Sequence, residues 1–301
     1  MLTEYALGSC IFDTTCFSDS EKCGIYLKNL KGILINDEAL VRDLHDGSWS
    51  KYVKNIQSKH PNTKYILQSL GKQLRRVKAA DNNVPVSHLD WCNEALKSHR
   101  NESLNGIIVS KDIVKIFTGE GLVASIESLD KTPWWENRSP SINIERRTNE
   151  YLHHLKRVYS HANSIMFIDP YIDPVQHDYR EFYHLLARIP NRDIPPLIQI
   201  HMCHLKNTTI TGYEQDFRSK LTNVIQSAKL TVEVFIWDKF HNRYLISNFI
   251  GINLPYGFSI SDIPNEKTIW TRIGRNDRDD IQREFDQASG RHKLQHRFTV
   301  S

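Results

Sequence analysis

The sequence lacks the features that mark membrane proteins, disulfide-stabilised domains and repeat proteins. No run approaches the roughly 18 apolar residues that a membrane-spanning helix needs. The opening segment MLTEYALGSC has neither the basic region nor the apolar region of a secretory signal. The five cysteines are scattered without CxxC spacing, so neither a disulfide framework nor a zinc site is indicated. We therefore expect a cytoplasmic protein with reduced cysteines and no membrane span.

Length and composition indicate an ordinary globular chain with more than one domain. The chain has 301 residues, which exceeds the size at which one core usually suffices, with 40% hydrophobic and 25% charged residues. Pro133 and Pro140 interrupt the periodic pattern in the segment TPWWENRSPS, residues 132–141, which we interpret as a linker. Apolar strand patterns alternate with helical patterns on both sides. The prediction is two α/β domains, residues 1–132 and residues 142–301.

Positive charge is slight overall but locally concentrated. The formal net charge is +4, which is weak support for a polyanionic partner. Basic stretches at 72–78, at 145–157 and in the C-terminal RHKLQHRF say more. Each of them is also compatible with a solvated helix face. Together they make nucleic acid a reasonable partner.

Four aspartates stand where predicted elements would present them to one point. Asp13 and Asp112 are expected at the ends of strands, and Asp43 and Asp90 on helices. Clustered carboxylates repel one another and are tolerated mainly around a hard cation, so Mg²⁺ or Mn²⁺ is the predicted cofactor. Such a metal activates water and stabilises charge on a scissile phosphate. The alternative is that these aspartates serve as caps and turn formers.

The first domain resembles the PIN family of metal-dependent ribonucleases over roughly residues 3–130. FDTT (12–15) is similar to that family's opening strand-Asp-Thr element, and the segment from Asp37 to Leu44 to its second acidic element. The helix with Asp90, and IIVSKD (107–112), are similar to the third and fourth elements. The resemblance implies a PIN-like three-layer sheet domain with Asp13, Asp43, Asp90 and Asp112 as catalytic residues. It implies Asp13, Asp90, Glu94 and Asp112 as metal ligands, with Asp37 or Glu38 as alternatives to Asp43.

The second domain resembles the phospholipase D superfamily over residues 142–301. His241-Asn-Arg243, with Asn248 five residues later and the trailing YGFS (256–259), is similar to the motif HxKxxxxD with its glycine and serine. Arg243 and Asn248 replace that motif's lysine and aspartate. Arginine can grip a phosphate with two hydrogen bonds, but asparagine cannot support an imidazolium. The departures favour a phosphate-binding, catalytically reduced domain, whose expected ligands are His241, Arg243, Asn248, Arg272 and Arg275.

These observations lead to an expected function, with two alternatives. The expectation is a metal-dependent endoribonuclease, acting on single-stranded RNA and regulated by the phosphate-binding domain. By analogy, an effector joined to a sensor suggests a toxin or antiviral defence role. A homo-oligomer and a partner protein from the same operon are left open. The alternatives are a non-catalytic phosphate- or nucleic-acid-binding protein, and a dimeric phospholipase D-type nuclease acting through His241. His204 and Lys206 repeat the HxK spacing, which we interpret as coincidence.

Overall fold

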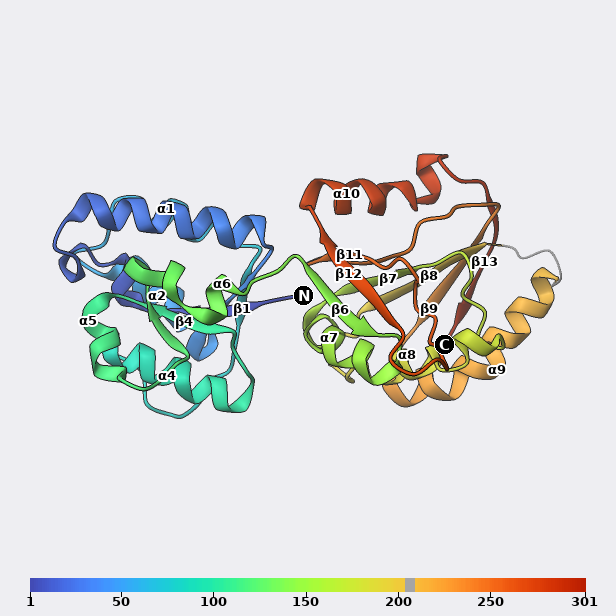
Figure 1. Cartoon of the computed structure of the whole chain (residues 1–301), viewed down its shortest axis with the longest axis horizontal. Helices are drawn as coiled ribbons and strands as arrows, with labels where there is room; N and C mark the ends of the chain where they lie inside the picture. The colour runs from blue at the N-terminus through green and yellow to red at the C-terminus, as the bar shows by residue number, and fades with distance from the viewer. Residues whose placement is uncertain (204–208) are drawn as a thin grey trace. The chain divides into compact units, whose positions relative to one another are not determined.

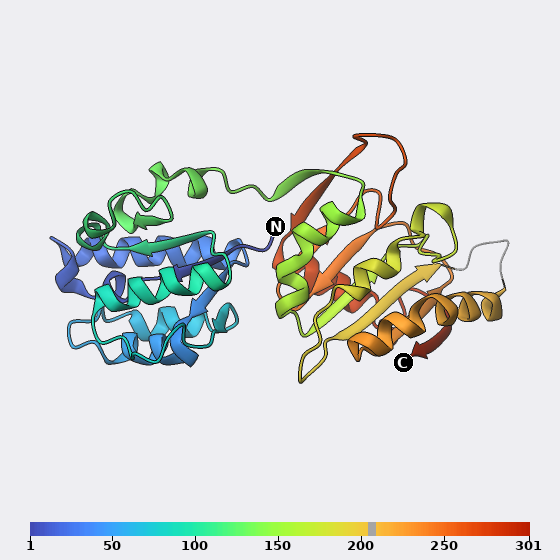
Figure 2. The ribbon, with the colours of Figure 1, turned by 90° about the horizontal axis from the view of Figure 1, so that it is seen from below.

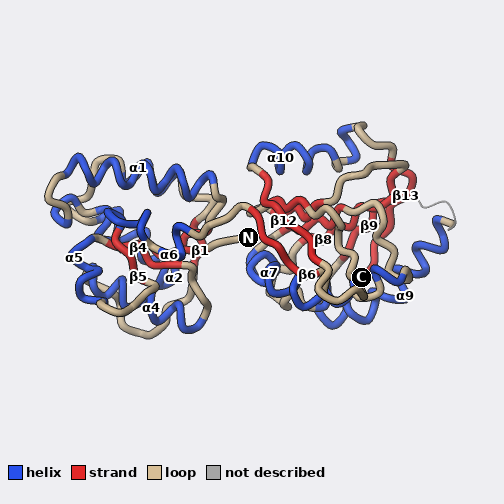
Figure 3. Tube along the Cα trace, in the orientation of Figure 1, coloured by secondary structure: helices blue, strands red, loops and turns tan. Residues whose placement is uncertain are grey.

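The chain forms two compact α/β units, which confirms the predicted fold class. The computed structural model describes residues 1–203 and 209–301, so His204 and Lys206 lie outside the described residues. The N-terminal domain comprises residues 3–138, and the C-terminal domain combines residues 1–2 with residues 139–301. Figure 3 shows a sheet flanked by helices in each of them. The two domains are described separately.

The N-terminal domain is built on a five-stranded sheet in the order β3-β2-β1-β4-β5. All of its pairings are parallel. The three inner strands are buried along their whole length, as expected for a parallel sheet covered on both faces. The strands are β1 (Glu4–Leu7), β2 (Leu40–Asp43), β3 (Leu74–Arg76), β4 (Gly106–Val109) and β5 (Val123–Ser125).

Helices cover both faces of this sheet. Figure 1 shows α1 on one face and α4 on the other. The α-helices are α1 (Ser20–Asn36), α2 (Leu44–Asn55), α3 (Thr63–Ser69), α4 (His88–Asn101), α5 (Lys111–Val114) and α6 (Pro133–Glu136). The short 3-10 helices are η1 (Ser9–Phe12), η2 (Thr14–Cys16), η3 (Lys115–Phe117) and η4 (Ile126–Lys131).

Three expected elements of this domain differ from the structure. The first strand ends at Leu7, so Asp13 follows η1 rather than ending the strand. The expected helix with Asp43 is absent, because Leu27, Leu30 and Leu34 give α1 a buried stripe that carries it to Asn36. Asp43 ends a strand instead.

The fourth strand also ends early. It stops at Val109, and Asp112 falls in the short helix that follows. The helix expected around Asp90 is confirmed as α4.

A buried ion pair joins the sheet to α4. Glu4 of β1 and Arg42 of β2 are both fully buried, with Arg42 Nη2 2.8 Å from Glu4 Oε2. Arg42 Nη1 also donates to the carbonyl oxygens of Ser98 and Glu102, at the C-terminal end of α4. Arg75 of β3 adds a second cation to Glu4. Three strands and one helix are therefore fixed around a single carboxylate.

The C-terminal domain contains an eight-stranded mixed sheet in the order β13-β9-β8-β7-β10-β11-β12-β6. Strands β7, β8 and β9 pair in parallel, and the other neighbours pair antiparallel. The strands are β6 (Ser141–Glu145), β7 (Ser164–Ile168), β8 (Leu197–Cys203), β9 (Val232–Trp237), β10 (Tyr244–Ser247), β11 (Gly251–Asn253), β12 (Lys267–Ile273) and β13 (Leu294–Val300).

The α-helices of this domain divide unequally between the two faces of the sheet. Figures 1 and 2 show α7, α8 and α9 on one face and α10 on the other. In α9, Tyr213, Phe217, Leu221 and Ile225 repeat at four-residue spacing and are all buried. The helices are α7 (Thr148–His161), α8 (Phe182–Ala187), α9 (Ile210–Ala228) and α10 (Arg275–Glu284), with the 3-10 helices η5 (His177–Tyr179) and η6 (Gln287–Ser289).

The tryptophan pair of the expected linker belongs to the N-terminal domain. Trp134 and Trp135 lie in α6, and their rings are 5.8 Å and 5.4 Å from the Tyr5 ring. The Trp134 ring also fills the space that a side chain at Gly106 would need. The chain divides after Arg138, because these aromatic contacts hold α6 on the N-terminal sheet.

A tight turn packs against a buried carboxylate in the C-terminal domain. Gly257 has φ of +59°, and a Cβ built on it would lie 1.7 Å from Asp169 Oδ2. Asp169, just after β7, is fully buried and accepts hydrogen bonds from Tyr171 N, Phe258 N and the Tyr179 hydroxyl. Only glycine fits this position without displacing Asp169.

We predict that Gly257→Ala destabilises the protein more than Gly290→Ala does. Both glycines have positive φ, but nothing lies within 4 Å of a Cβ at Gly290. Gly290→Ala should cost about 1–2 kcal/mol from the backbone alone. Gly257→Ala should cost about 1–3 kcal/mol more from the clash. Urea denaturation of the two full-length variants tests this, and equal losses would contradict the packing described.

Candidate functional site

Asp13 lies near the carboxyl end of the central strand β1, where sites form in open α/β sheets. Its Oδ1 accepts hydrogen bonds from Thr15 N at 2.9 Å, from Thr15 Oγ1 at 2.7 Å and from Ser58 Oγ at 2.6 Å. The Thr14 hydroxyl points elsewhere and donates to the Ser58 carbonyl oxygen. Asp13 Oδ1 is therefore held by the protein, while Oδ2 is turned toward another group.

That group is His88, the first residue of α4. His88 Nε2 lies 3.1 Å from Asp13 Oδ2, and His88 Nδ1 lies 2.8 Å from Ser9 Oγ. Ser9 is fully buried, whereas the His88 side chain is 22% exposed. Ser9 thus orients the ring from its buried side. The exposed part of the pair belongs to His88, since Asp13 is buried.

Cys16 completes a cluster of three different ligand types. One ligand atom from each of Asp13, Cys16 and His88 lies within 4.8 Å of the other two. Cys16 is at the end of η2, one helical turn after Asp13. The cluster combines a carboxylate, a thiol and an imidazole. We call these three residues the Asp13 centre.

The Asp13 centre is electrostatically polarised. Burial alone would raise the pKa of the Asp13 carboxyl, but hydrogen bonds from Ser58, Thr15 and His88 outweigh it and hold the pKa below its usual range. Burial, helped by the neighbouring Asp13 charge, raises the pKa of the Cys16 thiol to about 12. At neutral pH the cluster therefore presents an ionised carboxylate beside a protonated thiol.

The other predicted carboxylates have partners of their own. Asp43 accepts hydrogen bonds from Ser50 N and Ser50 Oγ, both at 2.9 Å. Buried Glu94 accepts from Ala80 N at 2.8 Å. Exposed Asp112 pairs with Lys115 at 2.7 Å. Of the alternatives to Asp43, Asp37 pairs with Arg138, and Glu38 is buried in a left-handed turn.

Asp90 forms the capping box of α4. Its Oδ2 accepts from Val86 N, Ser87 N and Ser87 Oγ, while Ser87 Oγ accepts from Asp90 N. Among the described residues, Asp13, Asp43, Asp90 and Asp112 do not form a group of ligand atoms within 4.8 Å of one another. The structure brings Asp13 together with His88 and Cys16 in their place.

The residues predicted to bind phosphate in the C-terminal domain are split between the two ends of β10. His241 and Arg243 precede this strand, and Asn248 follows it, accepting a hydrogen bond from Asn163 N. Strand register places Arg272 beside Ile252, and Arg275 begins α10 beyond the end of β12. The five residues therefore do not line one pocket.

Arg243 lies over a buried acid at the carboxyl end of β7. Its Nε is 3.5 Å from Asp169 Oδ1 without forming a hydrogen bond, and its Nη1 donates to the Pro255 carbonyl oxygen at 2.8 Å. Burial raises the pKa of Asp169, although its hydrogen bonds and Arg243 oppose the rise. The guanidinium also lies 4.9 Å from the centre of the exposed Tyr171 ring. Much of the capacity of the Arg243 guanidinium to form hydrogen bonds and ion pairs is thus used by groups of the same domain.

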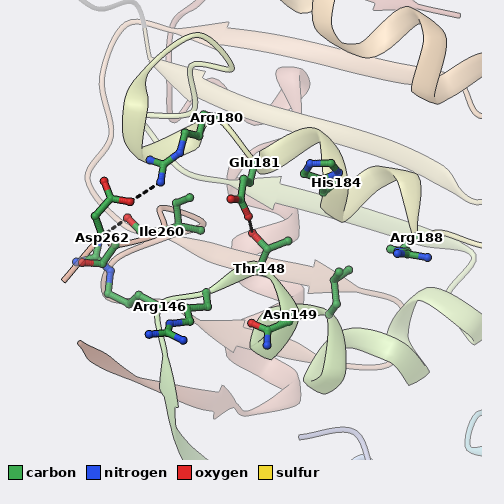
Figure 4. Close-up of a pocket in the computed structure, with 12 residues that line it drawn as sticks. Arg146, Thr148, Asn149, Arg180, Glu181, His184, Arg188, Ile260 and Asp262 are labelled. Atoms are coloured by element: carbon green, nitrogen blue, oxygen red, sulfur yellow. Dashed lines mark hydrogen bonds and ion pairs between the residues drawn. The ribbon is translucent and has the colours of Figure 1, made fainter. Parts of the chain in front are cut away.

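A basic pocket lies elsewhere in the same domain, between the start of α7 and α8 (Figure 4). It has a volume of about 550 Å³. Arginines from two segments, 146–147 and 180–188, line it together with His184, Glu181 and Asp262. Of the lining arginines, only Arg146 and Arg147 belong to a basic stretch that the sequence shows, residues 145–157. Arg180 and Arg188 come from a segment that showed no charge clustering.

Comparisons with known proteins do not assign the chain to a family. No family model matches it, and no curated protein does. Among solved structures, one of TrmBL2, described as an archaeal chromatin protein with a novel mode of DNA binding, is 14% identical over 78% of this chain and 82% of that chain. Its TM-score is 0.29, so the likeness carries no argument about fold or function. Within residues 1–203 and 209–301, no helix is long and apolar enough to cross a membrane.

We predict that Asp90 matters for stability and Asp112 does not. Asp90→Ala removes three accepted hydrogen bonds from the start of α4, so it should lower the urea midpoint of the full chain. Asp112→Ala removes one exposed pair and should leave the midpoint unchanged. If both variants unfold at the wild-type midpoint, the capping role of Asp90 is wrong.

Proposed function

We propose that the protein hydrolyses phosphodiester bonds of nucleic acid at the Asp13 centre. The observation that carries the proposal is the contact of His88 Nε2 with Asp13 Oδ2, 3.1 Å apart near the carboxyl end of β1. An ionised carboxylate and an imidazole held together, with the imidazole partly exposed, can move a proton or hold a metal ion. The substrate class rests on the PIN resemblance of the segment around Asp13, and single-stranded RNA is the form that we propose.

The donor set fits a divalent transition metal better than Mg²⁺. Nitrogen and sulfur ligands are suited to Zn²⁺, and Mn²⁺ accepts a nitrogen ligand beside oxygen, whereas Mg²⁺ prefers oxygen alone. Asp13 Oδ2 and His88 Nε2 would hold the ion, and Cys16 Sγ would join them by releasing its proton on metal binding. Such an ion would lower the pKa of a bound water and stabilise charge on the scissile phosphate. We therefore keep Mn²⁺ from the predicted pair and add Zn²⁺.

Ser9 lets His88 serve either purpose. Without a metal, a neutral ring that donates from Nε2 to Asp13 would accept a hydrogen bond at Nδ1 from the Ser9 hydroxyl. With a metal ion on Nε2, the ring would carry its proton on Nδ1 and would donate a hydrogen bond to Ser9 Oγ. A hydroxyl can play both parts, which is the outer support that metal-binding histidines usually have. The tautomer of His88 is thus set by what occupies Nε2.

The second candidate function is nucleic-acid binding without cleavage. Two exposed tyrosines of the C-terminal domain carry arginines over their rings, Arg243 at 4.9 Å from Tyr171 and Arg146 at 4.5 Å from Tyr256. Aromatic rings interleaved with cations are typical of surfaces that bind single strands. In the first candidate the same surface supplies the regulatory binding expected of a sensor in a toxin or defence protein.

We predict that Asp13→Asn and His88→Ala each lower cleavage of single-stranded RNA by at least about 100-fold. Asp112→Asn separates this centre from a four-carboxylate site, because its side chain is exposed and paired with Lys115. The Asp112→Asn variant should cleave at the wild-type rate if the Asp13 centre is the active site. It should lose activity if all four aspartates bind metal. Cleavage rates of a labelled oligonucleotide give the answer, and full activity in Asp13→Asn would refute the proposal.

We also predict that a chelator abolishes this cleavage and that added ions restore it unequally. Mn²⁺ or Zn²⁺ should restore more activity than Mg²⁺, because the centre includes nitrogen and sulfur donors. Cys16→Ser should reduce the difference between the activity restored by Mn²⁺ or Zn²⁺ and the activity restored by Mg²⁺, since it replaces the thiol with an oxygen ligand. Cleavage that persists in the chelator and disappears in His241→Ala would instead support a phospholipase D-type reaction.

A further inference from the structure

The proposed function leaves the basic pocket of the C-terminal domain unexplained. It measures about 550 Å³, within the range of about 300–1,000 Å³ that small-molecule sites occupy. Figure 4 shows its side chains arriving from the start of α7, from the segment around α8 and from the loop with Asp262. It lies wholly within one domain.

The charges of the pocket are partly balanced and partly available. Four arginines and a histidine face two carboxylates in the lining: Arg146, Arg147, Arg180, Arg188 and His184 against Glu181 and Asp262. Three of the arginines are paired, Arg146 with Glu266, Arg147 with Glu145 and Arg180 with Asp262. Arg188 is exposed, and in the described part of the chain it has no ion-pair partner. With these pairs counted, Arg188 is the arginine of the lining whose charge is open to a ligand.

The start of α7 adds partial positive charge to that of Arg188. Thr148 and Asn149, in its first turn, line the pocket, and the N-cap residue Arg147 gives no side-chain hydrogen bond to the amides of that turn. The N-terminus of a 14-residue helix carries partial positive charge. Helix and arginines therefore favour the same kind of ligand group, an anion with several oxygens.

The remaining lining requires more than an anion. Glu181 accepts a hydrogen bond from the Thr148 hydroxyl and would repel a bare phosphate. It can accept instead from a hydroxyl group on the ligand. Leu152 and Ile260 supply apolar surface, and the exposed His184 ring supplies a face for stacking. A ligand that fits this lining carries an anionic group, a hydroxyl group and a flat apolar group, and a nucleotide has all three.

We propose that this pocket binds a nucleotide, with its phosphate at Arg188 and the start of α7 and its sugar hydroxyls toward Glu181. The nucleotide is either a free mononucleotide or one unit of a single strand. Tyr256 connects the pocket with the surface described above for single strands, because Arg146 lines the pocket and its guanidinium lies over the exposed Tyr256 ring. The site stands independently of cleavage at the Asp13 centre.

The test measures binding to the full chain by calorimetry, with AMP, ATP, inorganic phosphate and a single-stranded RNA oligonucleotide as probes. Arg188→Ala should weaken nucleotide binding by about tenfold or more, and Arg147→Ala together with Arg188→Ala should weaken it further. Arg283→Ala is the matched control, because Arg283 is an exposed arginine of α10 that does not line the pocket. It should bind as the wild type does. Adding Asp13→Asn to every variant removes turnover from the measurement.

Each outcome decides the proposal. Binding of AMP or ATP that Arg188→Ala weakens supports it, with a free nucleotide as the source. Binding of the oligonucleotide alone, with the same dependence on Arg188, supports it with a strand as the source. Equal affinity for inorganic phosphate and nucleotides overturns it, because Glu181, Leu152 and His184 would then recognise nothing. Two further results overturn the proposal. One is a full chain that binds none of the probes, and the other is an Arg188→Ala variant that binds nucleotides as tightly as Arg283→Ala does.

Discussion

The buried pair of Glu4 and Arg42 is the interaction on which the N-terminal domain depends. Two charges removed from water are tolerated only when each is fully hydrogen-bonded, and here they are. Arg42 uses its remaining donors on the last carbonyl oxygens of α4. Because α4 is held at its C-terminal end, its first residue, His88, lies beside Asp13 at its N-terminal end. The fold thus fixes the distance that the proposed chemistry needs.

Much of the architecture could be predicted from apolar periodicity. The segments LIQIHMC and TVEVFIW are strands β8 and β9, and the four-residue stripe of α9 is a helix. The sequence predicts Asp13 at the end of the first strand, and the structure places it after η1, near the carboxyl end of that strand. The sequence predicts Asp90 and Asp112 for the same site, from a helix start and a strand end. The structure uses one as a cap and leaves the other exposed, since local hydrogen bonds decide what a short polar side chain does.

The rest required long-range contacts that no local pattern reveals. His88 is 75 positions from Asp13, and Ser9 is 79 positions from His88. A histidine before an aspartate at a helix start gives no sign of a ring placed between a buried serine and a carboxylate. Arg188 belongs to a weak charge pattern and is significant only because α7 and α8 lie side by side. The motif of His241, Arg243 and Asn248 likewise gives no sign that strand β10 lies between Arg243 and Asn248.

The central claim is that the protein's reactive centre is Asp13 with His88 and Cys16, and not a group of four aspartates. A crystal structure of the full chain soaked with Mn²⁺, with the ion located by its anomalous scattering, tests this most directly. The account predicts an ion bonded to Asp13 Oδ2 and His88 Nε2, with the Cys16 sulfur beside it and Ser9 Oγ still on His88 Nδ1. An ion held by Asp90, Glu94 or Asp112, with His88 unbound, would contradict it.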